Sequence, residues 1–324
     1  MGIPSSLSEP AAARQPPAVD DIISKLAAGD PATLAKCITL MESGGEVADL
    51  IHRRVCAKAG HAAVIGFTGA PGAGKSTLID AYIGSLRGRG QTVAVAAVDP
   101  TSPISGGAIL GDRVRMRRHS EDPGVFIRSV ASRGHLGGLS ESIHRIVDAM
   151  DAAGRDVVIV ETVGTGQSEV EVTEIADICV VVNAPNMGDD VQAMKAGVLE
   201  IADVLVVNKA DLPLAQRTTD QLKNMLKLRQ DRQDIAVIET VAIKGAGIDA
   251  LCAAIDGLLA TRAGNKEKNR HRRMRRLIAQ AAGRAVADLI RDAGAELEGL
   301  VKAAASGEIG VTEAAGRALS LIRS

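Results

Sequence analysis

Directly after the β-branched run VIGFT, the chain reads GAPGAGKST from Gly69 to Thr77, and the helix-patterned segment STLIDAYIGSL overlaps its end. The stretch matches GxxxxGK[ST] at every fixed position. A glycine-rich turn between a strand and a helix aims backbone N–H groups and the positive end of the helix at one point, where phosphate binds. The succession of strand, loop and helix predicts an α/β domain with a phosphate-binding loop.

The residue types in this loop match the needs of nucleotide binding. Glycines let the backbone approach phosphate oxygens, Lys75 reaches the β and γ phosphates, and the Ser76 hydroxyl coordinates Mg²⁺. We therefore expect phosphate contacts from Gly69, Gly72, Ala73, Gly74, Lys75, Ser76 and Thr77. A flexible glycine turn without a ligand is the alternative interpretation.

Short β-branched runs alternate with helix-patterned segments between residues 63 and 242. The runs are VIGFTG, TVAVAAVD, VFIRSVAS, DVVIVE, DICVVVNA, DVLVVN and IAVIETVA. Strands that alternate with helices are typical of a parallel, doubly wound sheet. The predicted fold class is therefore a P-loop NTPase of the α/β class with a mostly parallel sheet.

Four parts are expected along the chain. Residues 1–19 read as a disordered leader, 20–61 as an N-terminal helical extension, 62–262 as the nucleotide-binding domain and 263–324 as a C-terminal helical arm. The basic run NKEKNRHRRMRR is interpreted as the solvated start of a long helix, with an RNA-binding patch as the alternative. The apolar stripe from Leu277 to Ile290 needs a partner surface, which is the sheet domain, the N-terminal helices or a second copy of the chain.

Net charge, hydropathy and cysteine spacing indicate which partners, metal sites and cellular location to expect. With 38 basic and 39 acidic residues, the net charge is −1, so we expect neither nucleic acid nor a membrane as a partner. No apolar run reaches the roughly 18 residues of a membrane span. The four cysteines are far apart and read as buried reduced thiols rather than disulfides or metal ligands. A cytoplasmic location is expected.

The motif NKAD specifies the base. Asn208, Lys209 and Asp211 follow a predicted strand, and a carboxylate there accepts from both N1–H and the exocyclic amine of guanine. Adenine lacks that amine, so the buried carboxylate would reject it. A further base-contacting loop is expected at TVAIK, where Ala242 supplies a backbone N–H and Val241 replaces the usual Ser. A simple turn at the strand end is the alternative.

The stretch IVETVGTGQSE stands where most GTPases carry DxxG. Glu161 can bind Mg²⁺ directly or through water, and Gly164 is free to rotate toward a γ-phosphate. Gln167 comes three residues after Gly164 rather than directly after it, so it is not assigned the role of orienting water. Slow intrinsic GTP hydrolysis is the expected consequence.

Taken together, these segments resemble the MeaB/MMAA/ArgK family of SIMIBI-class P-loop GTPases. The phosphate loop, VDPTSPISGGAILGDRVRM, ETVGTGQSE, GDDVQAMKAG and NKAD stand in that family's order. The resemblance implies that Asp99 and Asp112 organise Mg²⁺ with Ser76 and Glu161. It also implies a third switch at 186–195, in which Gln192 and Lys195 have catalytic or coupling roles beside Lys75 and Glu161.

The resemblance further implies a GTP-hydrolysing chaperone of adenosylcobalamin-dependent methylmalonyl-CoA mutase. Such a protein gates cofactor loading, protects the mutase from inactivation, binds GTP or GDP with Mg²⁺, meets adenosylcobalamin only through its client, and forms a homodimer. The alternative is a P-loop kinase of the ArgK type that phosphorylates a small molecule or a transport protein. A metal-delivery GTPase is disfavoured because the six histidines are scattered.

Overall fold

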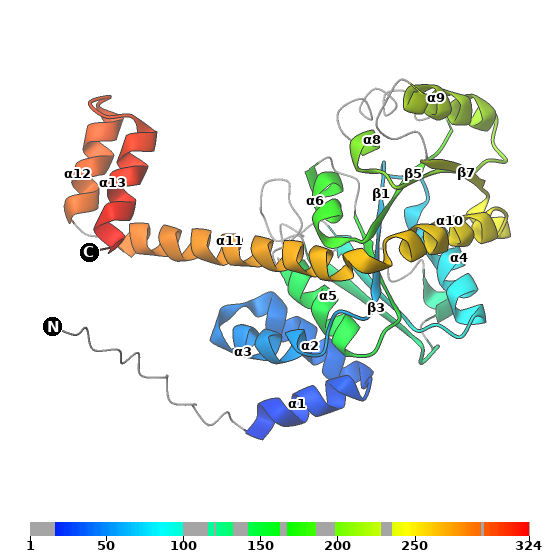
Figure 1. Ribbon diagram of the computed structural model, residues 1–324, viewed down its shortest axis with the longest axis horizontal. Coiled ribbons are helices and arrows are strands. Elements are labelled where there is room, and N and C mark those ends of the chain that lie inside the picture. Colours follow the sequence, from blue (N-terminus) through cyan, green and yellow to red (C-terminus); the bar gives the residue numbers. More distant parts are fainter. Residues whose placement is uncertain are drawn as a thin grey trace. The chain divides into compact units, whose positions relative to one another are not determined.

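The computed structural model describes residues 17–99, 116–119, 121–131, 142–162, 167–185, 198–227, 235–292 and 295–323 (Figure 1). Internal contacts divide the chain into two compact units, residues 1–269 and residues 270–324. The predicted Asp112, Gly164, Gln192 and Lys195 lie outside the described residues. Among the described helices, none combines the length and apolar content that crossing a bilayer requires.

The first unit is built on one seven-stranded parallel sheet, which confirms the predicted fold class. The strand order is β3-β2-β4-β1-β5-β6-β7. The strands are β1 (Ala63–Thr68), β2 (Val93–Asp99), β3 (Val125–Ala131), β4 (Val157–Glu161), β5 (Ile178–Asn183), β6 (Val204–Asn208) and β7 (Ala236–Thr240). β1 is central, with β4 and β5 as its two neighbours. The glycine-rich loop therefore leaves the sheet from its middle.

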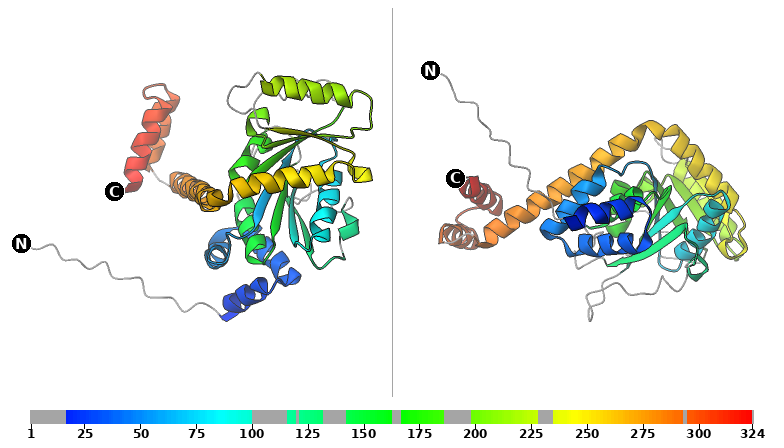
Figure 2. Two further views of the ribbon diagram at one scale, coloured as in Figure 1. Left: turned by 45° about the vertical axis from the view of Figure 1, so that its right-hand side comes forward. Right: turned by 90° about the horizontal axis from the view of Figure 1, so that it is seen from below.

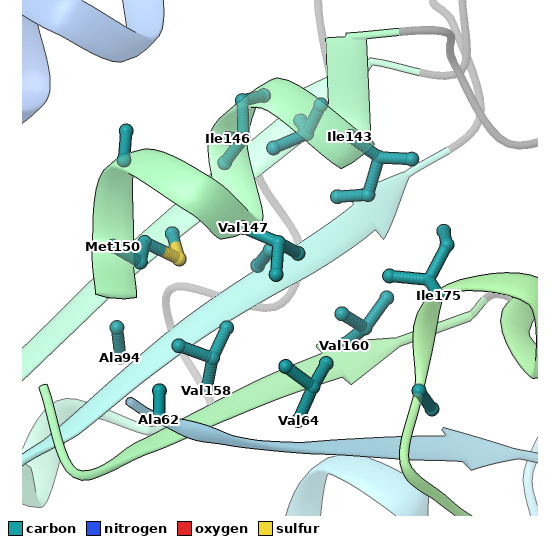
Figure 3. Close-up of a cluster of buried hydrophobic side chains, with 14 of the residues drawn as sticks. Ala62, Val64, Ala94, Ile143, Ile146, Val147, Met150, Val158, Val160 and Ile175 are labelled. Atoms are coloured by element: carbon teal, nitrogen blue, oxygen red, sulfur yellow. The ribbon is translucent and has the colours of Figure 1, made fainter. Parts of the chain in front are cut away.

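Helices cover both faces of the sheet. Alternate strand residues point to opposite sides, and the residues on both sides are apolar and buried. Val64, Val158 and Val160 face α5 (Ser142–Ala152) and α6 (Gln167–Ile175), as Figure 3 shows. On the other face, Ile65 and Ile159 pack with α4 (Lys75–Gly88) and α10 (Ile248–Thr261) (Figure 2). The near-absence of aromatic residues is thus compensated by interlocking Val, Ile, Leu and Ala side chains.

Several shorter helices after the glycine-rich loop also flank this core. They are α8 (Val198–Ile201), α9 (Ala215–Lys227) and the short 3₁₀ helices η2 (Arg117–His119), η3 (Ala242–Lys244) and η4 (Ala263–Asn265). On α9, the buried Leu222 and Leu226 join the same cluster as α5 and α6. The sheet core therefore extends under α9 at its β6 and β7 side.

Three N-terminal helices pack on α5: α1 (Pro17–Ala27), α2 (Pro31–Ser43) and α3 (Gly45–Cys56). Asp30 caps α2 by accepting from Thr33 N at 2.8 Å. The segment from α3 to β1 is fixed by Asp151 of α5, whose carboxylate accepts from the backbone N–H groups of residues 60, 61 and 62 at 2.6, 3.1 and 3.1 Å. This carboxylate therefore sets where β1 enters the sheet.

The second unit is helical. α11 (Lys266–Asp292) begins in the first unit and continues into the second, and α12 (Ala295–Ala305) packs against α13 (Val311–Arg323). The prediction that the basic run starts a long helix is confirmed, because α11 begins at Lys266. Apolar side chains stay exposed in this unit, among them Ile278 at 62% and Val311 at 79%.

Candidate nucleotide-binding site

The glycine-rich loop joins the end of β1 to the start of α4 through three glycines with left-handed backbone conformations. Gly69, Gly72 and Gly74 have φ angles of +135°, +79° and +89°. A Cβ at Gly69 would lie 2.1 Å from the Val182 carbonyl oxygen, and one at Gly74 would lie 2.4 Å from Asn208 Nδ2. Glycine is therefore required at Gly69 and Gly74 both by the backbone angle and by space.

Replacing Gly69 with Ala should lower the free energy of unfolding by about 2–4 kcal/mol, since a strained backbone and a clash with rigid backbone add together. Urea denaturation measures this loss. Gly84→Ala is the matched control, because Gly84 is an exposed position of α4 with nothing within 4 Å of the added Cβ. Gly84→Ala should leave stability equal or slightly higher. Equal stabilities of the two variants would contradict the packing described here.

Lys75 is the first residue of α4, and its side chain points back into the glycine-rich loop. Its side chain is buried, and Nζ donates to the carbonyl oxygens of Gly69 at 2.7 Å and Ala70 at 3.0 Å. A buried ammonium group needs such hydrogen bonds to offset its desolvation. The cation is thereby held within the curve of the loop, where phosphate oxygens would bind. Thr77 follows in the first turn of α4 and is half-buried.

Three oxygen-bearing side chains meet the needs of a magnesium ion at the carboxyl ends of the strands. Ser76 Oγ donates to Glu161 Oε1 at 2.7 Å, and both residues are buried. Asp99 ends β2 and is 3% exposed, two residues beyond Ala97, whose register partner is Glu161. A hydroxyl and two carboxylates are hard ligands of the kind that Mg²⁺ prefers. The residues present therefore fit the ion.

Asn208 joins three loops around the site. Its Nδ2 donates to Ala73 O at 3.0 Å and to Gly74 O at 3.4 Å. Its Oδ1 accepts from Thr240 Oγ1 at 3.1 Å and from Ala242 N at 3.2 Å. All four hydrogen bonds come from one buried amide. Asn208 therefore fixes the NKAD segment to the phosphate loop and to the loop after β7.

Lys209 and Asp211 follow Asn208 in the NKAD segment, and both residues are exposed. Lys209 has a φ of +58°, and its Nζ donates to Gly72 O at 2.8 Å. Asp211 forms an ion pair with Lys244 of η3 at 3.0 Å, with its side chain 35% exposed. The hydrogen bond from Lys244 lowers the pKa of the Asp211 carboxyl. Asp211 is therefore a charged acceptor at neutral pH.

Two contacts near the site had no signal in the motifs. Asp80 of α4 forms an ion pair with Arg118, and its carbonyl oxygen lies 3.0 Å from His119 Nε2, so η2 is held on the helix of the phosphate loop. Lys244 ends the TVAIK stretch, but its pairing with Asp211, 33 positions away, depends on the parallel pairing of β6 and β7 across the α9 connection. Neither partner can be deduced from local spacing.

The structure brings together most of the predicted site. The phosphate loop, Asn208, Lys209 and Ala242 are linked by hydrogen bonds, and Ser76 contacts Glu161. The Ala242 N–H, predicted to meet the base, donates to Asn208 Oδ1. The catalytic and binding roles of these residues stay predictions.

Comparison with known proteins places this arrangement among GTPases. A family model described as "Methylmalonyl Co-A mutase-associated GTPase MeaB" matches residues 34–295. The chain is 49% identical over 238 residues to a Pyrococcus horikoshii protein that carries a GTPase name, covering 72% of this chain and 75% of the other. It is 34% identical over 283 residues to the mitochondrial methylmalonic aciduria type A homolog of Caenorhabditis briggsae, covering 80% and 69%.

A solved structure has the same fold over nearly the whole chain. The crystal structure of an LAO/AO transport system kinase aligns with a TM-score of 0.72 and 26% sequence identity, covering 97% of this chain and 100% of that one.

Proposed function

The chain belongs to the MeaB family of methylmalonyl-CoA mutase-associated GTPases, and from that premise we propose that it is a slow GTPase that serves as a chaperone of adenosylcobalamin-dependent methylmalonyl-CoA mutase. In this role the nucleotide state gates cofactor loading and protects the mutase. GTP or GDP with Mg²⁺ is the ligand of the chain itself, and adenosylcobalamin is met only through the client.

The observation that carries the GTP assignment is the position of Asp211. Asn208 fixes the NKAD segment against the phosphate loop. The residues proposed to bind the base and those proposed to bind the phosphates are therefore joined by hydrogen bonds. The Asp211 carboxylate accepts two hydrogen bonds from guanine, whereas adenine presents an acceptor at N1 and no amine beside it. Displacement of a fluorescent GDP analogue by GTP, with ATP failing at equal concentration, tests this selectivity.

In the proposed reaction the residues of the chain position and stabilise charge. The loop N–H groups and Lys75 would hold the β and γ phosphates, while Ser76, Asp99 and Glu161 would hold Mg²⁺. The metal ion, when bound, neutralises charge that develops on the phosphate oxygens. Gln167 begins α6 rather than directly following Gly164 in sequence, so it is not assigned to water activation. Slow hydrolysis without a partner follows from this arrangement.

Glu161→Gln should reduce Mg²⁺-dependent GTP turnover at least about tenfold, because it removes one metal-binding charge while keeping a group that can accept from Ser76. Asp99→Ala should act in the same direction. Turnover at saturating GTP across a Mg²⁺ titration measures both effects. Glu121→Gln, at an exposed residue before β3, is the control. Unchanged turnover and unchanged Mg²⁺ dependence in both site variants would overturn the metal assignment.

The competing proposal is a kinase, and the observation that favours it is the kinase name of the solved relative. A kinase transfers the phosphoryl group to an acceptor other than water, which requires a base at the acceptor. Among the described acids near the phosphate loop, Asp99 and Glu161 are proposed metal ligands, Asp80 is paired with Arg118 and Asp211 with Lys244. Mutase-dependent GTP hydrolysis and acceptor-dependent phosphate transfer therefore distinguish the two proposals.

A homodimer through the C-terminal arm completes the proposal. Large apolar side chains exposed in the second unit support it, because a second copy of the chain would remove them from water: Ile278, Leu289, Val301, Val311 and Leu319. Sedimentation equilibrium of the full chain measures the oligomeric state.

A further inference from the structure

A cluster of three potential metal ligands lies between α3 and α5. His52 and Cys56 are one turn apart on α3, and Asp148 reaches them from α5. His52 Nε2 is 3.0 Å from Asp148 Oδ2 and 3.3 Å from Cys56 Sγ, and Cys56 Sγ is 3.7 Å from Asp148 Oδ2. One nitrogen, one sulfur and one oxygen therefore converge at a single place.

The three separations match one face of a zinc coordination tetrahedron. Ligand bonds of about 2.0 Å to oxygen, 2.05 Å to nitrogen and 2.3 Å to sulfur at tetrahedral angles give edges of about 3.3 Å (N–O), 3.5 Å (N–S) and 3.5 Å (S–O). The observed edges are 3.0, 3.3 and 3.7 Å in the same order. A metal ion would thus need only small side-chain adjustments.

In the part of the chain that the structure describes, protein hydrogen bonds satisfy only one of the two carboxylate oxygens of Asp148. Both contacts to Asp148 use the same carboxylate oxygen, since His52 Nε2 lies 3.0 Å from Oδ2 and Cys56 Sγ donates to Oδ2 at 3.7 Å. Asp148 is 5% exposed, and its Oδ1 has no hydrogen-bond partner among the described residues. A buried carboxylate with an unsatisfied oxygen is costly. A divalent cation would satisfy all three side chains together.

We propose that His52, Cys56 and Asp148 form a binding site for zinc or a similar divalent transition metal, with water as the fourth ligand. Cys56 is partly exposed, which gives the ion and a water a path to the site. Binding forms a metal–thiolate bond and releases the thiol proton to solvent. The site shares no residue with the proposed Mg²⁺ ligands, and a thiolate and an imidazole select softer metals than a hydroxyl and carboxylates do.

The metal would fasten the N-terminal helices to the sheet domain. α3 and α5 are already connected by the ion pair between Asp49 and Arg145 at 2.7 Å. That pair is weak, since Asp49 is 65% exposed. A metal shared between the two helices would add a stronger connection through buried groups.

The test is a Co²⁺ titration of the full-length protein in excess Mg²⁺, which occupies oxygen-only sites. We expect one equivalent of Co²⁺ to give a thiolate-to-cobalt charge-transfer band that Zn²⁺ abolishes by displacement. Cys56→Ser should lose the band, and Asp148→Asn should weaken Co²⁺ binding. Cys252→Ser is the matched control, because that thiol donates to Ser85 Oγ at 3.3 Å on the other face of the sheet and should leave the band intact.

Two further measurements use the wild-type protein and so do not depend on the folding of a variant. On the wild-type protein, Zn²⁺ should raise the thermal unfolding midpoint and slow alkylation of Cys56, followed by mass spectrometry. The absence of a charge-transfer band at stoichiometric Co²⁺, or an equal band in Cys56→Ser, would overturn the proposal. The cluster would then be a hydrogen-bonded packing contact only.

Discussion

Replacing Asp211 with Asn should weaken GTP binding at least about 100-fold and create binding of xanthosine triphosphate. In the proposed complex the carboxylate would accept two hydrogen bonds from guanine, each worth about 1.5–3 kcal/mol because the acceptor is charged. An amide keeps one acceptor but presents an N–H₂ group to the guanine amine, which is also a donor. Xanthine carries a carbonyl oxygen at that place, so the amide is complementary to it.

The Asp211→Asn variant also breaks the ion pair with Lys244, and a matched variant separates the two effects. Lys244→Ala removes the pair but keeps the carboxylate, so it should change GTP affinity by less than about fivefold, as for an exposed ion pair. Titration of both variants with GTP and xanthosine triphosphate measures the difference. Equal losses of GTP affinity in the two variants would show that Asp211 acts through Lys244 and not through the base.

Lys75→Ala should abolish detectable GTP hydrolysis, with a loss in kcat of at least about 100-fold. A buried cation preorganised against the transferred phosphoryl group stabilises charge that develops in the transition state, and single groups of this kind contribute about 10²–10³ in kcat. In the structure this ammonium is already held by the carbonyl oxygens of Gly69 and Ala70. Single-turnover hydrolysis of preloaded GTP measures the chemical step.

The control for Lys75→Ala is the same substitution at Lys223, an exposed residue of α9. Circular dichroism and urea denaturation should show both variants folded, since Lys75 is the first residue of α4 and belongs to neither apolar core cluster. If preloaded Lys75→Ala protein hydrolyses GTP at the rate of the parent protein, the assignment of Lys75 to catalysis is wrong.

Much of the fold could be predicted because short sequence patterns indicate individual strands and helices. Each of the seven β-branched runs became a strand of one parallel sheet, and the glycine-rich motif became a strand–loop–helix turn. Unbroken apolar runs show that both faces of a strand are buried, but not which strand lies beside it. The placement of β2 between β3 and β4 depends on long-range packing that no single run encodes.

In the candidate site, too, the local motifs could be predicted and the long-range contacts could not. Motifs located Lys75, Ser76 and Asp211, because the chemistry of phosphate, metal and base fixes residue types at fixed spacings. The role of Asn208 as a junction of three loops required the fold, since its partners come from separate segments. The cluster of His52, Cys56 and Asp148 was missed for a similar reason: Asp148 lies 96 residues from His52.

The most direct measurement is GTP hydrolysis by the purified protein, alone and with adenosylcobalamin-dependent methylmalonyl-CoA mutase added. The proposed chaperone role predicts a slow basal rate that rises severalfold with the mutase and no such reaction with ATP. A rate that is indifferent to the mutase but rises with a small-molecule acceptor, with phosphate appearing on that acceptor, would contradict the chaperone role and establish the kinase instead.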